Sequence, residues 1–152
     1  MSIPERVTLI EVGPRDGLQN EPAFVPSKQK IELINQLSQT GLKHIEVTSF
    51  VSPKAIPQLA DNTIVFDAIN KPRDVHFSAL IPNERGMQQA LKAGLQNIAV
   101  FTAASESFNQ RNINCSIADS IKRIEPVIHE ARAHKLHVRA YISCVLGCPY
   151  EG

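Results

Sequence analysis

An arginine and an aspartate stand side by side where a strand is expected to end. Arg15 and Asp16 lie between Gly13 and Gly17, directly after the apolar run 7–12. In parallel α/β sheets, ligands bind beyond the carboxyl ends of the strands. Glycines there let the backbone approach a ligand, and an acid beside a cation can hold a divalent metal next to an anionic substrate. A plain surface ion pair between the two side chains is the alternative interpretation.

Glu46 is an acid in the middle of another strand-like run, residues 44–50. A parallel strand that is covered on both faces is normally apolar. Burying an unpaired carboxylate costs several kcal/mol, so Glu46 needs a partner. We therefore expect Glu46 to point into a barrel and to meet Arg15 or another cation. A purely structural ion pair is the alternative. Glu11, an acid in the first strand-like run, is a weaker candidate for the same kind of buried pairing.

Further polar side chains follow the expected strands. Ser49 ends the second strand, the hydroxyls within 102–105 follow the fourth, and Asn112 lies in the long loop after it. These side chains would lie at the same end of the predicted barrel as Arg15. A solvated loop is the alternative for the hydroxyls, and helix capping is the alternative for the asparagine.

The cysteines and histidines form no recognised metal or nucleophile motif. Cys144 and Cys148 are separated by three residues, and no second pair exists to complete four zinc ligands. The five histidines are scattered, with no His-x-His. The sequence also lacks G-x-G-x-x-G, G-x-x-x-x-G-K and G-x-S-x-G, so neither a nucleotide cradle nor a nucleophile elbow is expected.

The elements that must position these residues alternate between strands and helices. Short runs rich in β-branched residues predict five strands, at 7–12, 44–50, 76–81, 97–102 and 137–143. Apolar residues at helical spacing predict helices after a Ser27 cap, before Gly94 and after Ser116, with a weaker helix over 62–69. Parallel neighbours need a crossover, usually a helix, so this alternation indicates a parallel sheet and an α/β fold.

The spacing of the strands predicts a TIM (β/α)8 barrel. The centres of the five runs are on average about 32 residues apart, which matches the ~250 residues of eight units. The sequence therefore predicts a barrel truncated to about its first five β/α units, and no linker marks a second domain. An open sheet of the flavodoxin type is the alternative. Five strands would leave two unpaired edges and an apolar inner face, so we expect residues 1–152 alone to self-associate.

Composition and charge exclude several classes of protein. The 152 residues are 43% hydrophobic and 20% charged, as in a globular chain of about one domain. Sixteen Lys and Arg against fifteen Asp and Glu leave a net charge of +1 without charge blocks, so neither nucleic acid nor a membrane is an expected partner. No apolar run approaches the ~18 residues of a membrane helix, and no signal peptide is expected. Three cysteines, an odd number, favour a reducing compartment, by default the cytoplasm.

Four blocks of the sequence resemble the hydroxymethylglutaryl-CoA lyase family. They are Val12–Glu21, Ile45–Pro53, Phe101–Glu106 with Asn112–Cys115, and Ser143–Cys144 with Leu146–Gly152. Their order and separation also fit, and the match runs over the whole chain.

The resemblance implies a TIM-barrel metallolyase that uses Mg²⁺ or Mn²⁺ to cleave 3-hydroxy-3-methylglutaryl-CoA to acetyl-CoA and acetoacetate, in leucine degradation and ketone-body formation. It implies a homo-oligomer, a dimer, in the full-length form. By motif, Asp16 would be a metal ligand, Arg15 the cation that steadies the developing enolate oxygen, and Glu46 a partner that orients the site. The residues near substrate would be Gln19, Ser49 and Asn112. Such a cleavage needs a deprotonated C3 hydroxyl and positive charge where the enolate forms.

The family's other metal ligands, a His-x-His pair and an Asn, and its mobile catalytic cysteine come from later strands that this sequence does not contain. Cys144 and Cys148 belong to a different segment. We therefore expect residues 1–152 to be the N-terminal part of one lyase domain and to be inactive alone.

Two alternatives stay open. A Claisen-type acyl-CoA synthase of the same superfamily would share the Arg-Asp-Gly of residues 15–17. Such synthases typically read Asp-Thr-Thr-Leu-Arg-Asp-Gly, whereas this chain approaches the motif through residues 11–14, Glu-Val-Gly-Pro, which favours the lyase. A non-catalytic fragment that needs a partner is the other alternative.

Overall fold

A four-stranded parallel sheet forms the centre of the computed structural model, which describes residues 3–152. The strands are β1 (His44–Ser49), β2 (His76–Leu80), β3 (Asn97–Ala103) and β4 (His137–Ser143). The helices are α1 (Ser27–Leu37), α2 (Asn62–Ala68), α3 (Glu84–Lys92), α4 (Glu106–Ile113) and α5 (Ile117–Ala133). Two short elements are the π-helical turn η1 (Gly13–Gly17) and the 3₁₀ turn η2 (Pro57–Leu59). None of the described helices is long and apolar enough to cross a membrane.

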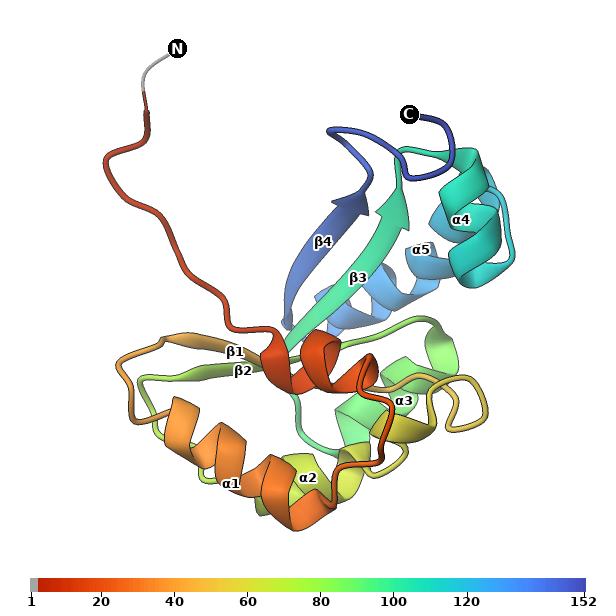
Figure 1. The fold of residues 1–152 in the computed structure, drawn as a ribbon. Helices are drawn as coiled ribbons and strands as arrows, with labels where there is room; N and C mark the ends of the chain where they lie inside the picture. The colour runs from red at the N-terminus through yellow and green to blue at the C-terminus, as the bar shows by residue number, and fades with distance from the viewer. Residues whose placement is uncertain (1–2) are drawn as a thin grey trace.

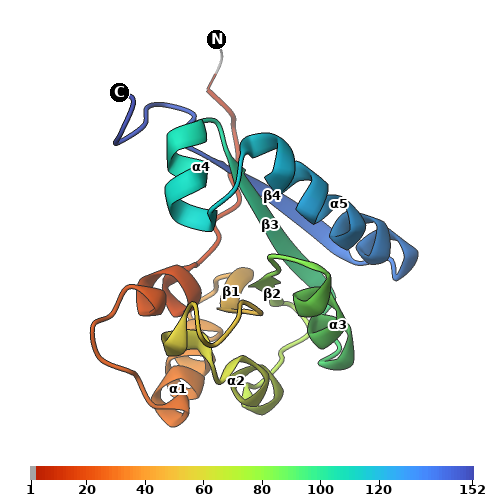
Figure 2. The same cartoon turned by 90° about the vertical axis from the view of Figure 1, so that its right-hand side faces the viewer.

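The strands lie side by side in chain order, β1-β2-β3-β4, and every neighbouring pair is parallel. Figures 1 and 2 show α1, α2, α3 and α5 on one side of this sheet. A doubly wound sheet of the flavodoxin type reverses its strand order at a switch point, and no reversal occurs within residues 3–152. The α/β fold is confirmed, and the described strands follow the order of a barrel.

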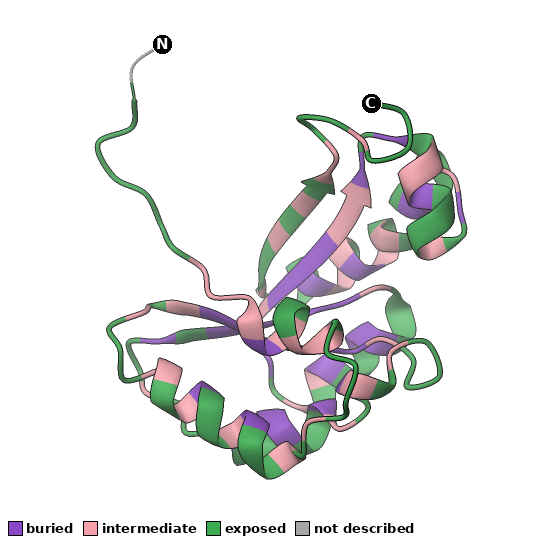
Figure 3. Cartoon of the chain, in the orientation of Figure 1, coloured by how far each residue is buried: buried purple, intermediate pink, exposed green. Residues whose placement is uncertain are grey.

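The hydrophobic core lies between the helices and the outer face of the sheet. Ile45, Phe77 and Ile98 of the strands belong to one buried cluster with Ile34 of α1 and Val127 of α5. Figure 3 shows the buried residues concentrated along β3 and on the sides of the helices that face the sheet. Since strand residues alternate between faces, the remaining strand positions form the inner face.

The inner face is polar at the starts of the strands. Register pairs Glu46 with Ser78, Ser78 with Asn97 and Asn97 with His137, so these four residues share that face. A register shift between Glu46 and Thr48 returns Ser49 to the face of Glu46, although the two residues are three positions apart in the sequence. The expectation of an apolar inner face is therefore only partly met. Polar residues occupy its beginning, whereas Leu80, Ala99 and Phe101 lie on the same face further along the strands.

The first expected strand, 7–12, is not a strand. This segment leads away from the sheet, and only Glu11 pairs with it, through an isolated bridge to Ile45 (Figure 1). Val7 and Leu9 are 74% and 69% exposed. Within residues 3–152 no second strand lies along this segment, so its alternating pattern has nothing to pack against. The described sheet therefore has four strands where five were expected.

Two helix boundaries also differ from expectation. Asn112, expected in a loop, lies in α4, which Ser105 caps by accepting a hydrogen bond from the Phe108 amide. Ser27, expected as a cap, is the first residue of α1, and its hydroxyl donates to Asp61 instead. Ser116 does cap α5, as the sequence predicts.

Candidate active site

Glu46 is fully buried and forms an ion pair with Arg15. The Glu46 side chain is 0% exposed and that of Arg15 is 12% exposed, and Arg15 Nε donates to Glu46 Oε1 at 2.6 Å. The prediction that Glu46 is buried beside a cation is confirmed, and the cation is Arg15. Because both charges are largely removed from water, losing one partner would leave the other uncompensated.

The bridge between Glu11 and β1 brings Arg15 to Glu46. Glu11 N donates to His44 O at 2.9 Å, and Glu46 N donates to Glu11 O at 2.8 Å. The chain then turns into η1, where Gly13 N donates to Glu11 Oε1 at 2.6 Å. A Cβ atom on Gly13 would lie 2.7 Å from that same oxygen, so the contact as it stands requires glycine. The Glu11 carboxylate thus stabilises the turn η1, which places Arg15 beside Glu46.

Tyr141 completes the cluster, and the sequence reasoning missed it. Its hydroxyl, which comes from β4, donates to Glu46 Oε2 at 2.9 Å. Burial, followed by the negative charge of Glu46, raises the pKa of Tyr141, so the phenol remains a protonated donor at neutral pH. A signal was present in the sequence, since His137, Arg139 and Tyr141 are polar at the period of two that marks one face of a strand.

Asp16 is the exposed end of the cluster. Its side chain is 54% exposed, and Oδ1 accepts a hydrogen bond from Arg15 Nη1 at 2.7 Å. Carboxylate oxygens suit Mg²⁺ and Mn²⁺. In residues 3–152, however, no group of three or more His, Cys, Asp or Glu is placed to hold a metal. The described residues offer one candidate ligand and do not make a metal site by themselves.

The other predicted site residues make no side-chain hydrogen bond with Arg15, Asp16 or Glu46 in the described part of the chain. Gln19 is half-buried just after η1, and Asn112 is exposed on α4. Ser49 is buried at the carboxyl end of β1, and its hydroxyl is the one buried side-chain polar atom without a partner among residues 3–152. A buried hydroxyl without a partner costs free energy, and a bound ligand could satisfy it.

A protein-family model described as HMGL-like matches residues 6–152, nearly the whole chain. The chain belongs to the HMGL-like family. This confirms the family resemblance seen in the blocks around Arg15, Glu46 and Cys148.

Relatives and a solved structure agree with the HMGL-like match. The chain is 57% identical over 150 residues to the "3-hydroxy-3-methylglutaryl-CoA lyase, cytoplasmic" of Rattus norvegicus, covering 99% of this chain and 44% of the relative. It is 54% identical over 151 residues to the "Hydroxymethylglutaryl-CoA lyase, mitochondrial" of Gallus gallus, covering 99% and 51%. The crystal structure of hydroxymethylglutaryl-CoA lyase from Pseudomonas aeruginosa matches with a TM-score of 0.94 at 55% identity, covering 100% of this chain and 51% of that one. This HMGL-like chain therefore spans about half the length of the relatives it matches.

Proposed function

We propose that the chain is the N-terminal part of a single TIM-barrel domain, a carbon–carbon lyase that cleaves 3-hydroxy-3-methylglutaryl-CoA to acetyl-CoA and acetoacetate. The observation that carries this proposal is Arg15, which the buried Glu46 holds at 2.6 Å and which Asp16 flanks at 2.7 Å. The printed names of the lyases from rat, chicken and Pseudomonas support the substrate class.

The reaction breaks the C2–C3 bond of the substrate. A base takes the proton of the C3 hydroxyl, and C3 becomes the ketone carbon of acetoacetate. The bonding electron pair moves to the thioester half as an enolate, which then takes a proton at C2 to give acetyl-CoA. Negative charge therefore develops on the thioester oxygen, and the proposed role of Arg15 is to stabilise it there.

Glu46 and Tyr141 act as positioning residues in this proposal. Glu46 is buried and accepts hydrogen bonds from Arg15 and Tyr141 on its two oxygens, so it is engaged on the protein side. The pair limits the orientations of the guanidinium before substrate binds. A donor that is fixed in advance stabilises developing charge without a cost of reorganisation at the moment of reaction.

Gln19, Ser49 and Asn112 are proposed to contact the substrate. The buried hydroxyl of Ser49, which has no partner among the described residues, supports this role most directly. The proposed contacts of Gln19 and Asn112 rest on the family motif.

Asp16 is proposed to supply one ligand to a divalent metal, Mg²⁺ or Mn²⁺. Such an ion would polarise the oxygens of the substrate. No group of three His, Cys, Asp or Glu among residues 3–152 completes this site, and in this proposal the further ligands come from the later strands that the family resemblance implies.

A cytoplasmic location and a homodimeric full-length form complete the proposal. Cys115, Cys144 and Cys148 are free, as expected in a reducing compartment, and the rat relative is named cytoplasmic although the chicken relative is named mitochondrial. Cell fractionation tests the location, and light scattering of the full-length form tests the dimer.

The experiment compares the chain alone with the chain joined to the C-terminal half of the Pseudomonas lyase. With Mg²⁺ or Mn²⁺, the joined protein should release acetoacetate from 3-hydroxy-3-methylglutaryl-CoA, and the chain alone should not. Asp16→Asn in the joined protein should abolish metal-dependent turnover. A joined protein that is folded by circular dichroism and releases no acetoacetate would refute the proposal. Condensation of acetyl-CoA with a 2-oxo acid would favour the synthase alternative.

A further inference from the structure

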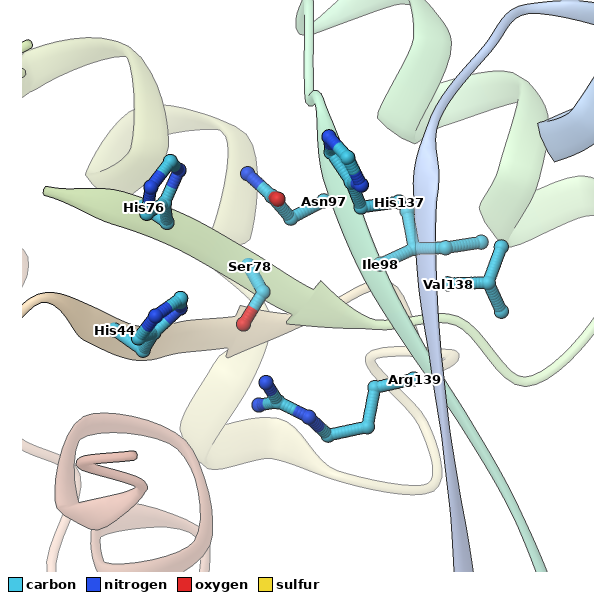
Figure 4. A pocket seen from close by; sticks show the side chains of 8 residues that line it. All are labelled: His44, His76, Ser78, Asn97, Ile98, His137, Val138 and Arg139. Carbon is cyan, nitrogen blue, oxygen red and sulfur yellow. The ribbon is translucent and has the colours of Figure 1, made fainter. Parts of the chain in front are cut away.

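A second polar site lies at the starts of the strands, next to the cluster of Arg15, Glu46 and Tyr141. The first residues of the four strands, His44, His76, Asn97 and His137, line a pocket of about 380 Å³ together with Ser78 and Arg139. Figure 4 shows His44 and His76 next to each other on β1 and β2, and Arg139 extending from β4 toward them. The two imidazole rings are stacked, with their centres 5.0 Å apart.

The charges around this pocket are one-sided. None of the residues that line it, all in the described part of the chain, is acidic. Arg139 takes part in none of the ion pairs found in residues 3–152. The nearest acids have other partners: Glu46, further along β1, is held by Arg15 and Tyr141, and Asp74, just before β2, by Lys43. Arg139 also lies near the Tyr141 hydroxyl, which is neutral and supplies no counter-charge.

His44 responds to its burial and to this excess of positive charge. Burial, and then the neighbouring His76 and Arg139, lower the pKa of His44. His44 is therefore neutral at neutral pH, and an anion held beside it would reverse that effect and raise its pKa.

We propose that this pocket, centred on Arg139, binds a single oxyanion of the carboxylate class. A guanidinium presents a planar fork of N–H donors that matches a carboxylate with two parallel hydrogen bonds. The three imidazoles offer further N–H donors around it. A half-buried arginine without a counter-charge is costly, so an anion here stabilises the strand ends as well as binding to them.

The carboxylate can come from a small molecule or from an acidic side chain of a polypeptide segment that covers the inner face. Both sources present the same chemical group to Arg139. A titration with a free anion and a measurement on a longer chain tell them apart.

In the first arm, the histidine resonances of the chain are followed by NMR while acetate, and separately inorganic phosphate, is added. Binding should raise the pKa of His44, while His129 and His134, which lie on or just after α5, should not respond. Arg139→Gln should weaken binding by about tenfold or more, through loss of the bidentate contact. Arg132→Gln removes the same charge from an exposed position at the end of α5 and should leave binding unchanged.

In the second arm, the same measurement is made on the chain joined to the C-terminal half of the Pseudomonas lyase. A pKa of His44 that is higher in the joined protein than in the chain alone, and that added acetate raises no further, identifies a side-chain carboxylate as the occupant. The proposal is overturned if the pKa of His44 stays lowered under all conditions in both proteins, or if Arg139→Gln and Arg132→Gln behave alike. Neither readout depends on lyase turnover, so this inference can fail while the proposed function stands.

Discussion

Arg15 bonds two carboxylates whose surroundings differ. Glu46 is shielded from water, whereas Asp16 faces solvent. An exposed ion pair contributes only about 0–1 kcal/mol, so the bond to Asp16 exchanges readily with water or a ligand. The buried bond to Glu46 holds the guanidinium in place while its outer side remains available for chemistry.

Replacing Glu46 should be far more damaging than replacing Asp16. Glu46→Ala leaves Arg15 uncompensated and should lower the free energy of unfolding by about 3–5 kcal/mol. Asp16→Ala removes an exposed carboxylate from the same arginine and should cost about 1 kcal/mol or less. Thermal midpoints measured at equal protein concentration check this, since each kcal/mol corresponds to about 2–4 °C in a domain of this size. Equal shifts for the two variants would show that Glu46 is not a buried partner.

Tyr141→Phe should weaken the same cluster without removing a charge. The variant removes one of the hydrogen bonds that the buried Glu46 carboxylate accepts. Hydrogen bonds to charged groups contribute about 1.5–3 kcal/mol to the free energy of unfolding. Tyr150→Phe is the matched control, because the Tyr150 ring contacts Arg111 and Phe108 while its hydroxyl makes no hydrogen bond within the described chain. The thermal midpoint should fall by several degrees for the first variant and hardly change for the second. Similar midpoints for both would argue against the Tyr141 contact.

At the scale of elements, the sequence predicts the regular parts well and the irregular parts poorly. The runs at 44–50 and 137–143 match β1 and β4 closely, because alternation and β-branched residues act locally. The turn η1 depends on a bond between the Glu11 carboxylate and the Gly13 amide, which no periodic pattern reveals. The Tyr141–Glu46 contact joins β1 and β4 across two intervening strands, so it could not be predicted before the strand order was known.

Gly13→Ala tests whether the turn η1 depends on its side-chain bond. The added methyl group would meet Glu11 Oε1 at 2.7 Å and displace the carboxylate from the Gly13 amide. We expect a loss of about 1.5–3 kcal/mol, the contribution of a hydrogen bond to a charged group. Gly17→Ala, at the other end of η1, has nothing within 4 Å of the new atom and should be close to neutral. Urea unfolding followed by circular dichroism compares the two, and a neutral Gly13→Ala would contradict the role given to Glu11.

At the scale of the whole molecule, the described sheet has a free edge and exposed apolar groups. β4 pairs only with β3, and Val7, Leu9, Ile142 and Leu146 are largely exposed. Unpaired edges and apolar surface favour association with another chain. The 152-residue chain should therefore self-associate, with a mass by light scattering that rises with concentration, and it should release no acetoacetate. Ile142→Lys places a charge on the edge strand and should reduce association. A stable monomer that turns over substrate would contradict this view of the sheet.

The most direct test of the central claim is the kcat of Arg15→Lys in the joined protein that carries the C-terminal half of the Pseudomonas lyase. Lysine keeps the charge but lacks the planar fork that Glu46 holds, so it cannot present the same donors to the enolate oxygen. If Arg15 acts mainly on the transition state, kcat should fall by several orders of magnitude while KM for 3-hydroxy-3-methylglutaryl-CoA changes much less. A folded variant whose kcat stays within about tenfold of the parent would contradict the role assigned to Arg15.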